Sequence, residues 1–210
     1  TEAAYPHEQC IHQLFEEQAE RTPDKVALVC EDRSLTYREL FQQGLGLDPF
    51  DATGEQLRAP LAEYSIVADG LNRDDWLDLL ITHRLQAGFP SNRITVVRDW
   101  PATQCALARI RPGDPPLAER FELYLGHHEL ANGYHELTDA SEQRQRFQRD
   151  LVVREGRIAS LPVIDERLLD AMAQGLPECA GVALGVDRLL MAMLGTDRIA
   201  DVLAFDFAQA

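Results

Sequence analysis

The sequence predicts an α+β fold, in which an antiparallel sheet is flanked by helices and no Rossmann core is present. Three observations lead to this prediction. Residues 118–126 and 129–136 read as consecutive strands joined by a short turn, amphipathic helix patterns occupy 72–86 and 139–156, and the chain passes from strand to helix over 179–195. Consecutive strands with helices packed against them are typical of antiparallel α+β domains.

The composition is that of an ordinary globular chain, and it excludes some classes of function. The chain has 210 residues, of which 45% are hydrophobic and 26% charged, enough for one large domain or a domain with an appendage. The formal net charge of -15 repels phosphate backbones, so broad nucleic-acid binding is not expected. The four cysteines form no CxxC pair, and no signal pattern or long apolar run occurs. We therefore expect reduced thiols and a cytoplasmic location.

The first part of the chain is expected to contain two helices around a strand. Residues 11–19 carry apolar side chains on one helical face, and residues 25–31 read as a buried strand. A second helix is expected from residue 34, with Ser34 as its cap. Glycine, Asp-Pro and Thr-Gly breaks between 41 and 61 then indicate short helices joined by loops.

The middle and the later part of the chain alternate between helices and strands. Residues 72–86 place their apolar side chains on one side of a helix. Residues 93–100 and 105–111 read as strands, and residues 139–156 and 165–175 as helices.

Residues 118–126 form a strand with two different faces. The apolar side chains share one face, and Glu122 and Tyr124 share the other. Glu122 and Glu129 flank the turn "LGHH", so in a paired hairpin their carboxylates become diagonal neighbours. Two carboxylates alone would repel a phosphate, but together with Mg²⁺ they would hold one.

Residues 129–136 are unusually polar for a strand. Alternate side chains share a face, so Asn132, Tyr134 and Glu136 fall together on one side. An amide, a ring and a carboxylate in a row suit an amine-bearing ligand, because the carboxylate pairs with an ammonium group and the ring packs on an aliphatic stem. The alternative is a solvated hairpin face with ordinary surface charges, and this interpretation stays open on pattern alone.

Two smaller patterns were also weighed. Small residues in "GVALGVDRLL" would let a flat ring lie against the strand, and the following arginine could stack on a base or clamp a phosphate, although tight packing explains the glycines equally well. A metal site built on His127 and His128 is not expected, because adjacent strand residues point to opposite faces.

Two blocks of the sequence carry a resemblance to a known family. They are "ERFELYLGHHELANGYHELTDASEQRQRF" and "PECAGVALGVDRLLMAMLG". From about residue 41 to residue 210 the chain resembles the C-terminal part of the class II lysyl-tRNA synthetase catalytic domain, and it is most similar to the paralogues that lysylate elongation factor P. The second block resembles motif 3 of class II synthetases. The resemblance implies a partial class II aminoacyl-tRNA synthetase-like domain that joins ATP and a lysine-type amino acid into an aminoacyl-adenylate.

The resemblance also implies roles for single residues. Glu122 and Glu129 would bind Mg²⁺ and ATP, Asn132, Tyr134 and Glu136 would hold the amino acid, Gly181 and Gly185 would line the ATP site at the adenine, and Arg188 would be the catalytic arginine on ATP. Given these roles, we expect Asn132, Tyr134 and Glu136 to point into one pocket, with Arg188 and the two glutamates on its rim.

Ala183 bears on the amino acid and on the acceptor. It stands where ordinary lysyl-tRNA synthetases carry glycine and where the elongation factor P ligases carry alanine. The resemblance therefore implies β-lysine in preference to lysine, and a lysine of elongation factor P as the acceptor. Binding of tRNA is not expected, because no anticodon-binding domain is recognised, and a homodimer would follow the family pattern.

The chain departs from the family in one respect. Motifs 1 and 2 have no recognised counterpart, and residues 1–40 instead resemble the entry of a nonribosomal peptide synthetase adenylation domain, through "YPHEQCIHQLFEEQAERTPDKVALV" and "LTYREL". We therefore expect a boundary near residue 40 and adenylate formation near background. A lysyl-tRNA ligase fragment, an adenylation-domain fragment and a non-catalytic lysine- and ATP-binding protein remain as alternatives.

Overall fold

The computed structural model describes residues 20–21, 34–155 and 160–205. The helix expected over 11–19 and the strand expected over 25–31 lie outside the described residues. The compact unit that contains the sheet begins at Arg33. It includes Tyr37 and Leu40, which are buried in the core. The boundary near residue 40 and the assignment of residues 1–40 to a different family stay predictions.

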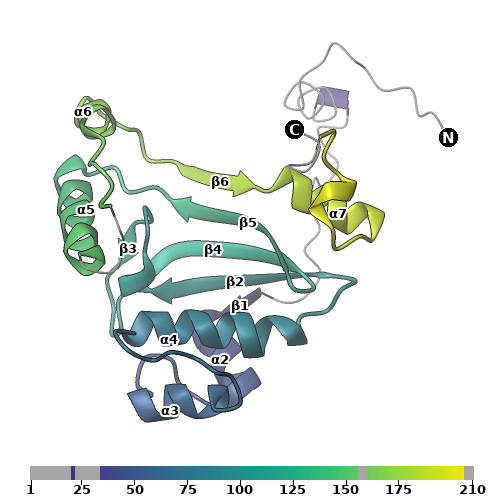
Figure 1. Ribbon diagram of the computed structural model, residues 1–210. Coiled ribbons are helices and arrows are strands. Elements are labelled where there is room, and N and C mark those ends of the chain that lie inside the picture. Colours follow the sequence, from purple (N-terminus) through teal and green to yellow (C-terminus); the bar gives the residue numbers. More distant parts are fainter. Residues whose placement is uncertain (1–19, 22–33, 156–159, 206–210) are drawn as a thin grey trace. The chain divides into compact units, whose positions relative to one another are not determined.

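The fold is α+β, as predicted, and is built on one six-stranded sheet (Figure 1). The strand order is β1-β2-β4-β5-β6, with the short β3 paired to β4. The pair β1 and β2 is parallel, and the remaining pairs are antiparallel. The strand bounds are Ser34–Thr36 for β1, Ile94–Pro101 for β2, Ile110–Arg111 for β3, Leu117–Leu125 for β4, His128–His135 for β5 and Ala180–Leu184 for β6.

The helices lie on one face of the sheet and at its two ends (Figure 1). Helices α2, α3 and α4 cover the β1–β2 side, α5 and α6 lie at one end of the strands, and α7 lies at the other. The bounds are Tyr37–Leu45 for α2, Gly54–Arg58 for α3, Arg73–Leu80 for α4, Ala140–Arg154 for α5, Glu166–Ala173 for α6 and Val186–Leu194 for α7. Short 3-10 helices follow at Ala59–Leu61, Gln86–Gly88, Ala102–Gln104 and Ile199–Asp201.

Two predicted elements differ in the structure. The helix expected over 72–86 divides into α4, a π-helical turn at Ile81–Leu85 and a 3-10 turn. The strand expected over 105–111 is reduced to the two residues of β3 and an isolated bridge between Ala108 and Glu136. Near its start, Ala106 has a left-handed backbone with φ 46. A non-glycine residue in that conformation interrupts an extended strand.

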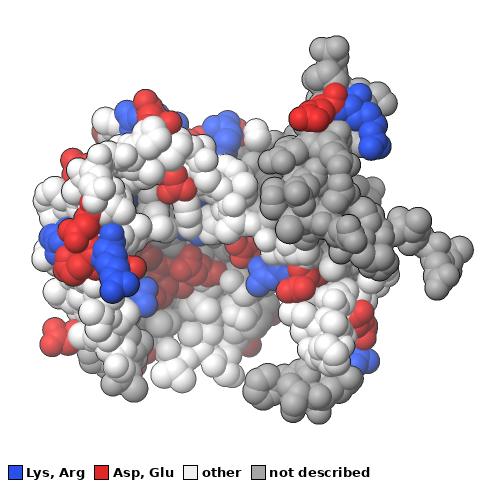
Figure 2. All heavy atoms as spheres, turned by 90° about the horizontal axis from the view of Figure 1, so that it is seen from above, with Lys and Arg blue, Asp and Glu red and all other residues white. Residues whose placement is uncertain are grey.

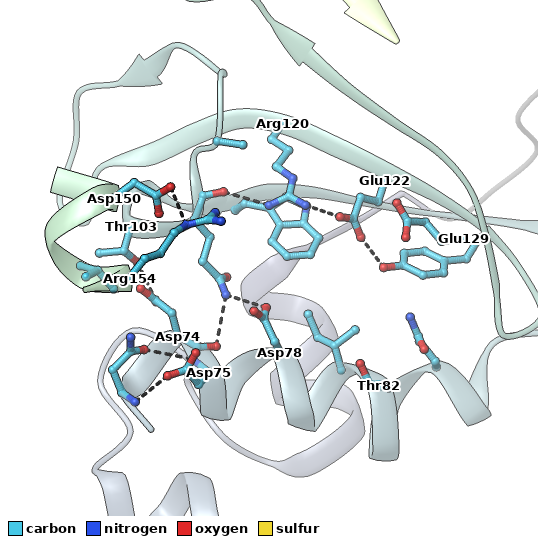
Figure 3. Close-up of a pocket in the computed structure, with 18 residues that line it drawn as sticks. Asp74, Asp75, Asp78, Thr82, Thr103, Arg120, Glu122, Glu129, Asp150 and Arg154 are labelled. Atoms are coloured by element: carbon cyan, nitrogen blue, oxygen red, sulfur yellow. Dashed lines mark hydrogen bonds and ion pairs between the residues drawn. The ribbon is translucent and has the colours of Figure 1, made fainter. Parts of the chain in front are cut away.

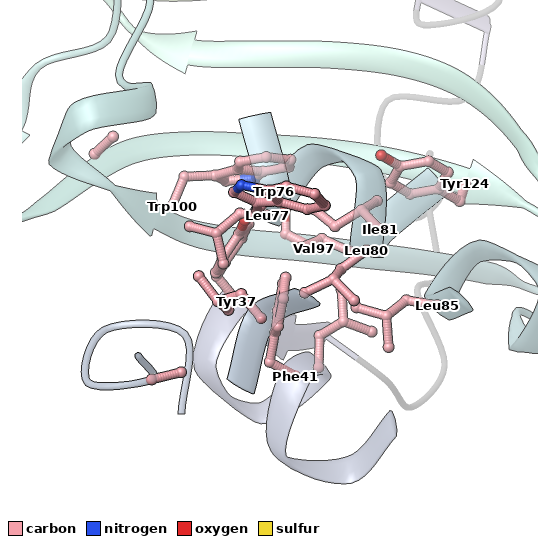
Figure 4. Close-up of a cluster of buried hydrophobic side chains, with 14 of the residues drawn as sticks. Tyr37, Phe41, Trp76, Leu77, Leu80, Ile81, Leu85, Val97, Trp100 and Tyr124 are labelled. Carbon is pink, nitrogen blue, oxygen red and sulfur yellow. The ribbon is translucent and has the colours of Figure 1, made fainter. Parts of the chain in front are cut away.

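The core lies between the sheet and helices α2 and α4 (Figure 4). Tyr37 stacks on Phe41 with ring centroids 4.8 Å apart, and it packs at 4.8 Å against Trp100 of β2. The sheet face that meets these rings is the one that carries Glu122 and Tyr124, which are buried, whereas the apolar side chains on the opposite face of β4 are only partly buried. The polar face of this strand is therefore its inner face.

A β-bulge interrupts the pairing of β4 with β5. Leu123 pairs with Ala131, but the next residue, Tyr124, pairs with Glu129, so Leu130 has no partner on β4. One extra residue on a strand reverses the faces of all the side chains that precede it. Glu129 therefore shares a face with Asn132, whereas strict alternation would place it on the face of Ala131.

The start of α2 is capped two residues later than the sequence suggested. The expected cap, Ser34, lies in β1, and Thr36 is the cap residue instead. The Thr36 hydroxyl accepts a bond of 3.1 Å from the Glu39 backbone N–H, and the Glu39 carboxylate accepts from the Thr36 N–H at 2.8 Å. The sequence pattern for this reciprocal capping box is Thr36-x-x-Glu39, which a reading centred on Ser34 overlooks.

Replacing Thr36 with alanine should therefore destabilise the domain, while replacing Ser34 should not. The Thr36→Ala change removes the cap of α2 and should lower the free energy of unfolding by about 0.5–2 kcal/mol. Urea denaturation followed by circular dichroism measures the difference, with Ser34→Ala as the matched control. Equal losses in the two variants would show that the cap assignment is wrong.

The same pair gives a pH dependence. Hydrogen bonds from Thr36 lower the pKa of the Glu39 carboxyl. A carboxylate whose pKa is lower in the folded state stabilises folding above its unfolded pKa, and this contribution is lost as the pH falls through the folded value. The stability difference between wild type and Glu39→Gln, measured by the same denaturation, should therefore shrink on acidification through and below the ordinary range of a glutamate.

Candidate functional site

The sheet register gathers most of the predicted site residues into two neighbouring rows. One row runs across Arg120, Tyr134 and Gly181, and the next runs across Glu122, Asn132 and Ala183. Paired residues of antiparallel strands share a face, and residues two apart on one strand do so as well. The two rows therefore form one continuous patch over β4, β5 and β6.

The bulge adds Glu129 to this patch, and the start of α7 holds it there. The N–H of Gly185 donates to the carbonyl of Leu130 at 2.8 Å. The Arg188 guanidinium donates to the carbonyl of Glu129 at 2.9 Å and lies 3.6 Å from its carboxylate. Arg188 and Glu129 are both partly open to solvent, so the pair stands at the rim of the patch.

Arg120 is the centre of a hydrogen-bond network on the inner face of β4 (Figure 3). Its guanidinium donates to the Glu122 carboxylate, to the Gln104 carbonyl at 2.9 Å and to the Asn132 side-chain oxygen at 3.4 Å. It also lies over the Trp100 ring at 4.1 Å from the ring centroid. These contacts fix the guanidinium on the aromatic core and direct one edge of it toward Glu122.

Glu122 is 5% exposed and is surrounded by donors. Besides Arg120, the Tyr124 hydroxyl donates to one carboxylate oxygen and the Asn132 amide donates to the other at 3.3 Å. Burial raises the pKa of Glu122 against the opposing effect of Arg120, and the nearby Glu129 raises it further. Burial and the Glu122 charge also raise the pKa of Tyr124. A cation placed between Glu122 and Glu129 would therefore favour the ionised form of the Glu122 carboxylate.

A cavity of about 620 Å³ opens between the sheet and α4 (Figure 3). Glu122 and Glu129 face it from the sheet, and Asp74 and Asp78 face it from α4. Burial raises the pKa of Asp78, although Arg120 acts against this. The acidic residues that line the cavity are Asp74, Asp75, Asp78, Glu122, Glu129 and Asp150, and the basic ones are Arg120 and Arg154. Figure 2 shows a hollow with acidic side chains at its bottom. Such a lining suits a cationic ligand or a metal ion.

The predicted amino-acid residues do not all point into this cavity. Asn132 bonds to Glu122 and Tyr134 packs against the hydrophobic core, but neither they nor Glu136 are among the described residues that line the cavity. The expectation of one common pocket for these three residues stays a prediction.

Glu136 lies at the far end of the patch, against Gly181. A Cβ atom at Gly181 would lie 2.4 Å from a carboxylate oxygen of Glu136, so only glycine leaves room for it. Gly133 faces the other way and lies under the Phe121 ring, which a Cβ would meet at 2.3 Å. Gly185 shows no such crowding, since its nearest contact would be 3.6 Å away.

Sequence reasoning missed Arg120, Trp100 and Gln104. One signal for Arg120 was present, because Arg120, Glu122 and Tyr124 alternate at the period of a strand and therefore share one polar face. Trp100 and Gln104 gave no signal, since their contacts with Arg120 depend on how β2 and the loop after it pack against β4.

No helix within the described ranges is long and apolar enough to cross a membrane.

Comparisons with known proteins place the chain in a family. The family model for class II tRNA synthetases (D, K and N) matches residues 4–209. Proteins from Salmonella gallinarum and Salmonella enteritidis that carry the name elongation factor P–(R)-β-lysine ligase are each 46% identical to the chain over 180 residues, which is 84% of the chain and 55% of the relative. The chain therefore spans about half the length of these curated relatives.

The same comparisons bear on the N-terminal segment. The family model already matches from residue 4, and neither it nor these relatives support the resemblance of residues 1–40 to an adenylation-domain entry. The family match extends over nearly the whole sequence. The chain belongs to the class II tRNA synthetases, in the group of the aspartate, lysine and asparagine enzymes.

Proposed function

We propose that this chain is part of an ATP-dependent ligase that activates (R)-β-lysine or lysine as an aminoacyl-adenylate and transfers it to a lysine of elongation factor P. The similarity to ligases of that name supports the reaction. The observation that carries the proposal is the shared face of Glu122, Glu129, Asn132 and Ala183, which the register and the bulge produce together. Because the proposed acceptor is a translation factor, the reaction is proposed to take place in the cytoplasm. It is proposed not to involve tRNA.

The amino acid is proposed to lie along the patch from Asn132 to Glu136. The Glu136 carboxylate would pair with an ammonium group, Tyr134 would pack on the aliphatic stem, and the Asn132 amide would orient the polar end. Gly181 leaves the space that the Glu136 carboxylate occupies. Ala183 lies directly opposite Asn132 in the register, so its methyl group would border the end of the ligand that Asn132 orients.

The two glutamates fit a magnesium ion in their chemistry. They stand on neighbouring strands and on one face, and the charge of Glu129 raises the pKa of Glu122. This mutual repulsion is what a divalent cation between the carboxylates would relieve, and Mg²⁺ takes one or two carboxylates together with phosphate oxygens. When bound, the ion would neutralise part of the charge on ATP. Glu129 would be the more available ligand, because three donors already occupy Glu122.

Arg188 and Arg120 would act at different distances from the substrates. Arg188 stands at the rim, half exposed, and is proposed to bind the ATP phosphates, while Gly181 and Gly185 are proposed to border the base. Arg120 would act as a positioning residue, because its bonds hold Glu122 and Asn132 in the orientations that both proposed ligands require. We also propose that the protein forms a homodimer, as the family resemblance implies.

The Glu136→Gln variant tests the amino-acid site. Losing a charge-assisted hydrogen bond should weaken binding of (R)-β-lysine by about ten- to a hundredfold, which corresponds to about 1.5–3 kcal/mol. Affinity for Mg²⁺-ATP should stay unchanged. Isothermal titration calorimetry on the 210-residue chain measures both affinities.

Two further variants make this test specific. Gly181→Ala should reproduce the loss with little effect on stability, because its methyl group displaces the flexible end of Glu136. Glu178→Gln, which changes an exposed carboxylate outside the patch, is the matched control. Equal affinity of wild type and Glu136→Gln for the amino acid would remove the proposed ammonium contact.

The Glu129→Gln variant tests the metal pair. Without this carboxylate the magnesium dependence of ATP binding should weaken, while binding of (R)-β-lysine should change little. The measurement is a titration with ATP at several Mg²⁺ concentrations, with Glu142→Gln on α5 as the control. An unchanged magnesium dependence would exclude Glu129 as a ligand.

The Ala183→Gly variant tests the choice between the two amino acids. Removing the methyl group opposite Asn132 should shift the ratio of the dissociation constants from (R)-β-lysine toward lysine. A methyl group is worth about 1 kcal/mol or more in such a pocket, so the ratio should change by roughly tenfold. If the ratio stays the same, Ala183 is not a determinant.

A further inference from the structure

Two histidines and an aspartate from distant parts of the chain meet beside α7. His128 Nε2 lies 3.1 Å and His127 Nε2 lies 3.8 Å from the same Asp197 carboxylate oxygen. The three ligating atoms all lie within 4.8 Å of one another. His127 lies in the β4–β5 turn and His128 begins β5, and Asp197 follows α7 at the same end of the sheet (Figure 1).

The arrangement corrects one expectation from the sequence. Adjacent strand residues point to opposite faces, but His127 belongs to the turn and only His128 belongs to β5. The turn leaves the two imidazole rings side by side, with centroids 4.0 Å apart. A nitrogen of each ring can therefore bind the same ion.

Two of the three separations are close to those of a tetrahedral metal site, and the third, between the two imidazole nitrogens, is at most 4.8 Å. Zinc bonds of 2.0–2.2 Å separate neighbouring ligand atoms of a tetrahedron by about 3.3–3.6 Å. The separations of 3.1 and 3.8 Å lie close to this range on either side, so small side-chain rotations suffice. Two imidazoles and a carboxylate suit Zn²⁺ and similar transition metals, whereas Mg²⁺ prefers oxygen ligands alone.

We propose that His127, His128 and Asp197 bind one divalent transition-metal ion, with Zn²⁺ the best fit, and leave a fourth position for water. The site is separate from the proposed magnesium pair in both chemistry and residues. The ion would connect the β4–β5 turn to the segment after α7. The turn leads directly into Glu129, and α7 carries Arg188. The ion would thus reinforce the junction that the Arg188–Glu129 contact already makes.

The competing explanation is an ordinary ion pair between a protonated histidine and Asp197. The side chain of Asp197 is 80% exposed, and a pair so open to solvent contributes little to stability. An ion pair needs a charged imidazole, whereas a metal ligand is neutral. The two explanations therefore differ in whether added Zn²⁺ binds here and raises the stability of the domain.

The test is a titration of the untagged, metal-free chain with Zn²⁺, followed by calorimetry, and with Co²⁺, followed by its visible absorption. We expect one saturable site that excess Mg²⁺ does not displace. Asp197→Asn and His128→Ala should each weaken binding by at least about tenfold, since loss of even an outer partner of a ligand costs 10–100-fold. At free Zn²⁺ about 100 times Kd, Tm should rise by roughly 5–10 °C in wild type and not in Asp197→Asn.

Matched variants locate the ion. Asp201→Asn changes a neighbouring carboxylate that bonds to Thr196 and should bind Zn²⁺ as the wild type does. Glu129→Gln removes a carboxylate of the proposed magnesium pair, and Cys10→Ser removes a thiol near the start of the chain. Both variants should also keep the full affinity for Zn²⁺. Absence of saturable binding would overturn the proposal, and so would affinity that survives Asp197→Asn or is lost in Glu129→Gln or Cys10→Ser. Because the readouts are metal binding and Tm, the outcome does not depend on the proposed ligase function.

Discussion

The contact between the start of α7 and the bulge in β5 is the constraint on which the candidate site depends. Leu130 has no partner on β4, and the carbonyl groups at the bulge instead accept bonds from Gly185 and Arg188. Backbone carbonyls in a buried strand need such partners, because leaving one unpaired costs about 1–3 kcal/mol. The bulge and the helix start therefore stabilise each other, and together they turn Glu129 toward Glu122.

The polar inner face of β4 connects this junction to the hydrophobic core. Arg120 stacks on Trp100, and Trp100 packs against Tyr37 of α2. Buried charges are tolerated when each is paired and hydrogen-bonded, and here the guanidinium, the Glu122 carboxylate and the Tyr124 hydroxyl satisfy one another. The aromatic core thus serves as the platform that fixes the orientation of the polar network. Looser packing around Trp100 would therefore disturb the position of Arg120, and with it the orientation of Glu122.

Two contacts between distant parts of the sequence lie at the end of the sheet next to α7. Arg188 reaches back 59 residues to Glu129, and Asp197 reaches back 69 residues to His128. One connection runs from the β4–β5 hairpin to α7, and the other runs from the hairpin to the segment that follows α7. They share one mechanical consequence, because a hairpin held at its turn cannot slide along its neighbour, and a fixed register keeps Glu122 and Glu129 on the same face.

The sequence by itself determined the α+β class, the order of most elements, the family, and the common face of Asn132, Tyr134 and Glu136. These follow from local periodicity and from motifs that are contiguous in the chain. Only the tertiary structure decided that Glu129 joins that face, that the polar side of β4 is the buried one, and that His127 and His128 converge on Asp197. The physical reason is the same in each case. A bulge, a buried charge and a convergent turn are stable only because of partners far along the chain, namely Gly185, Trp100 and Asp197, and periodicity carries no information about such partners.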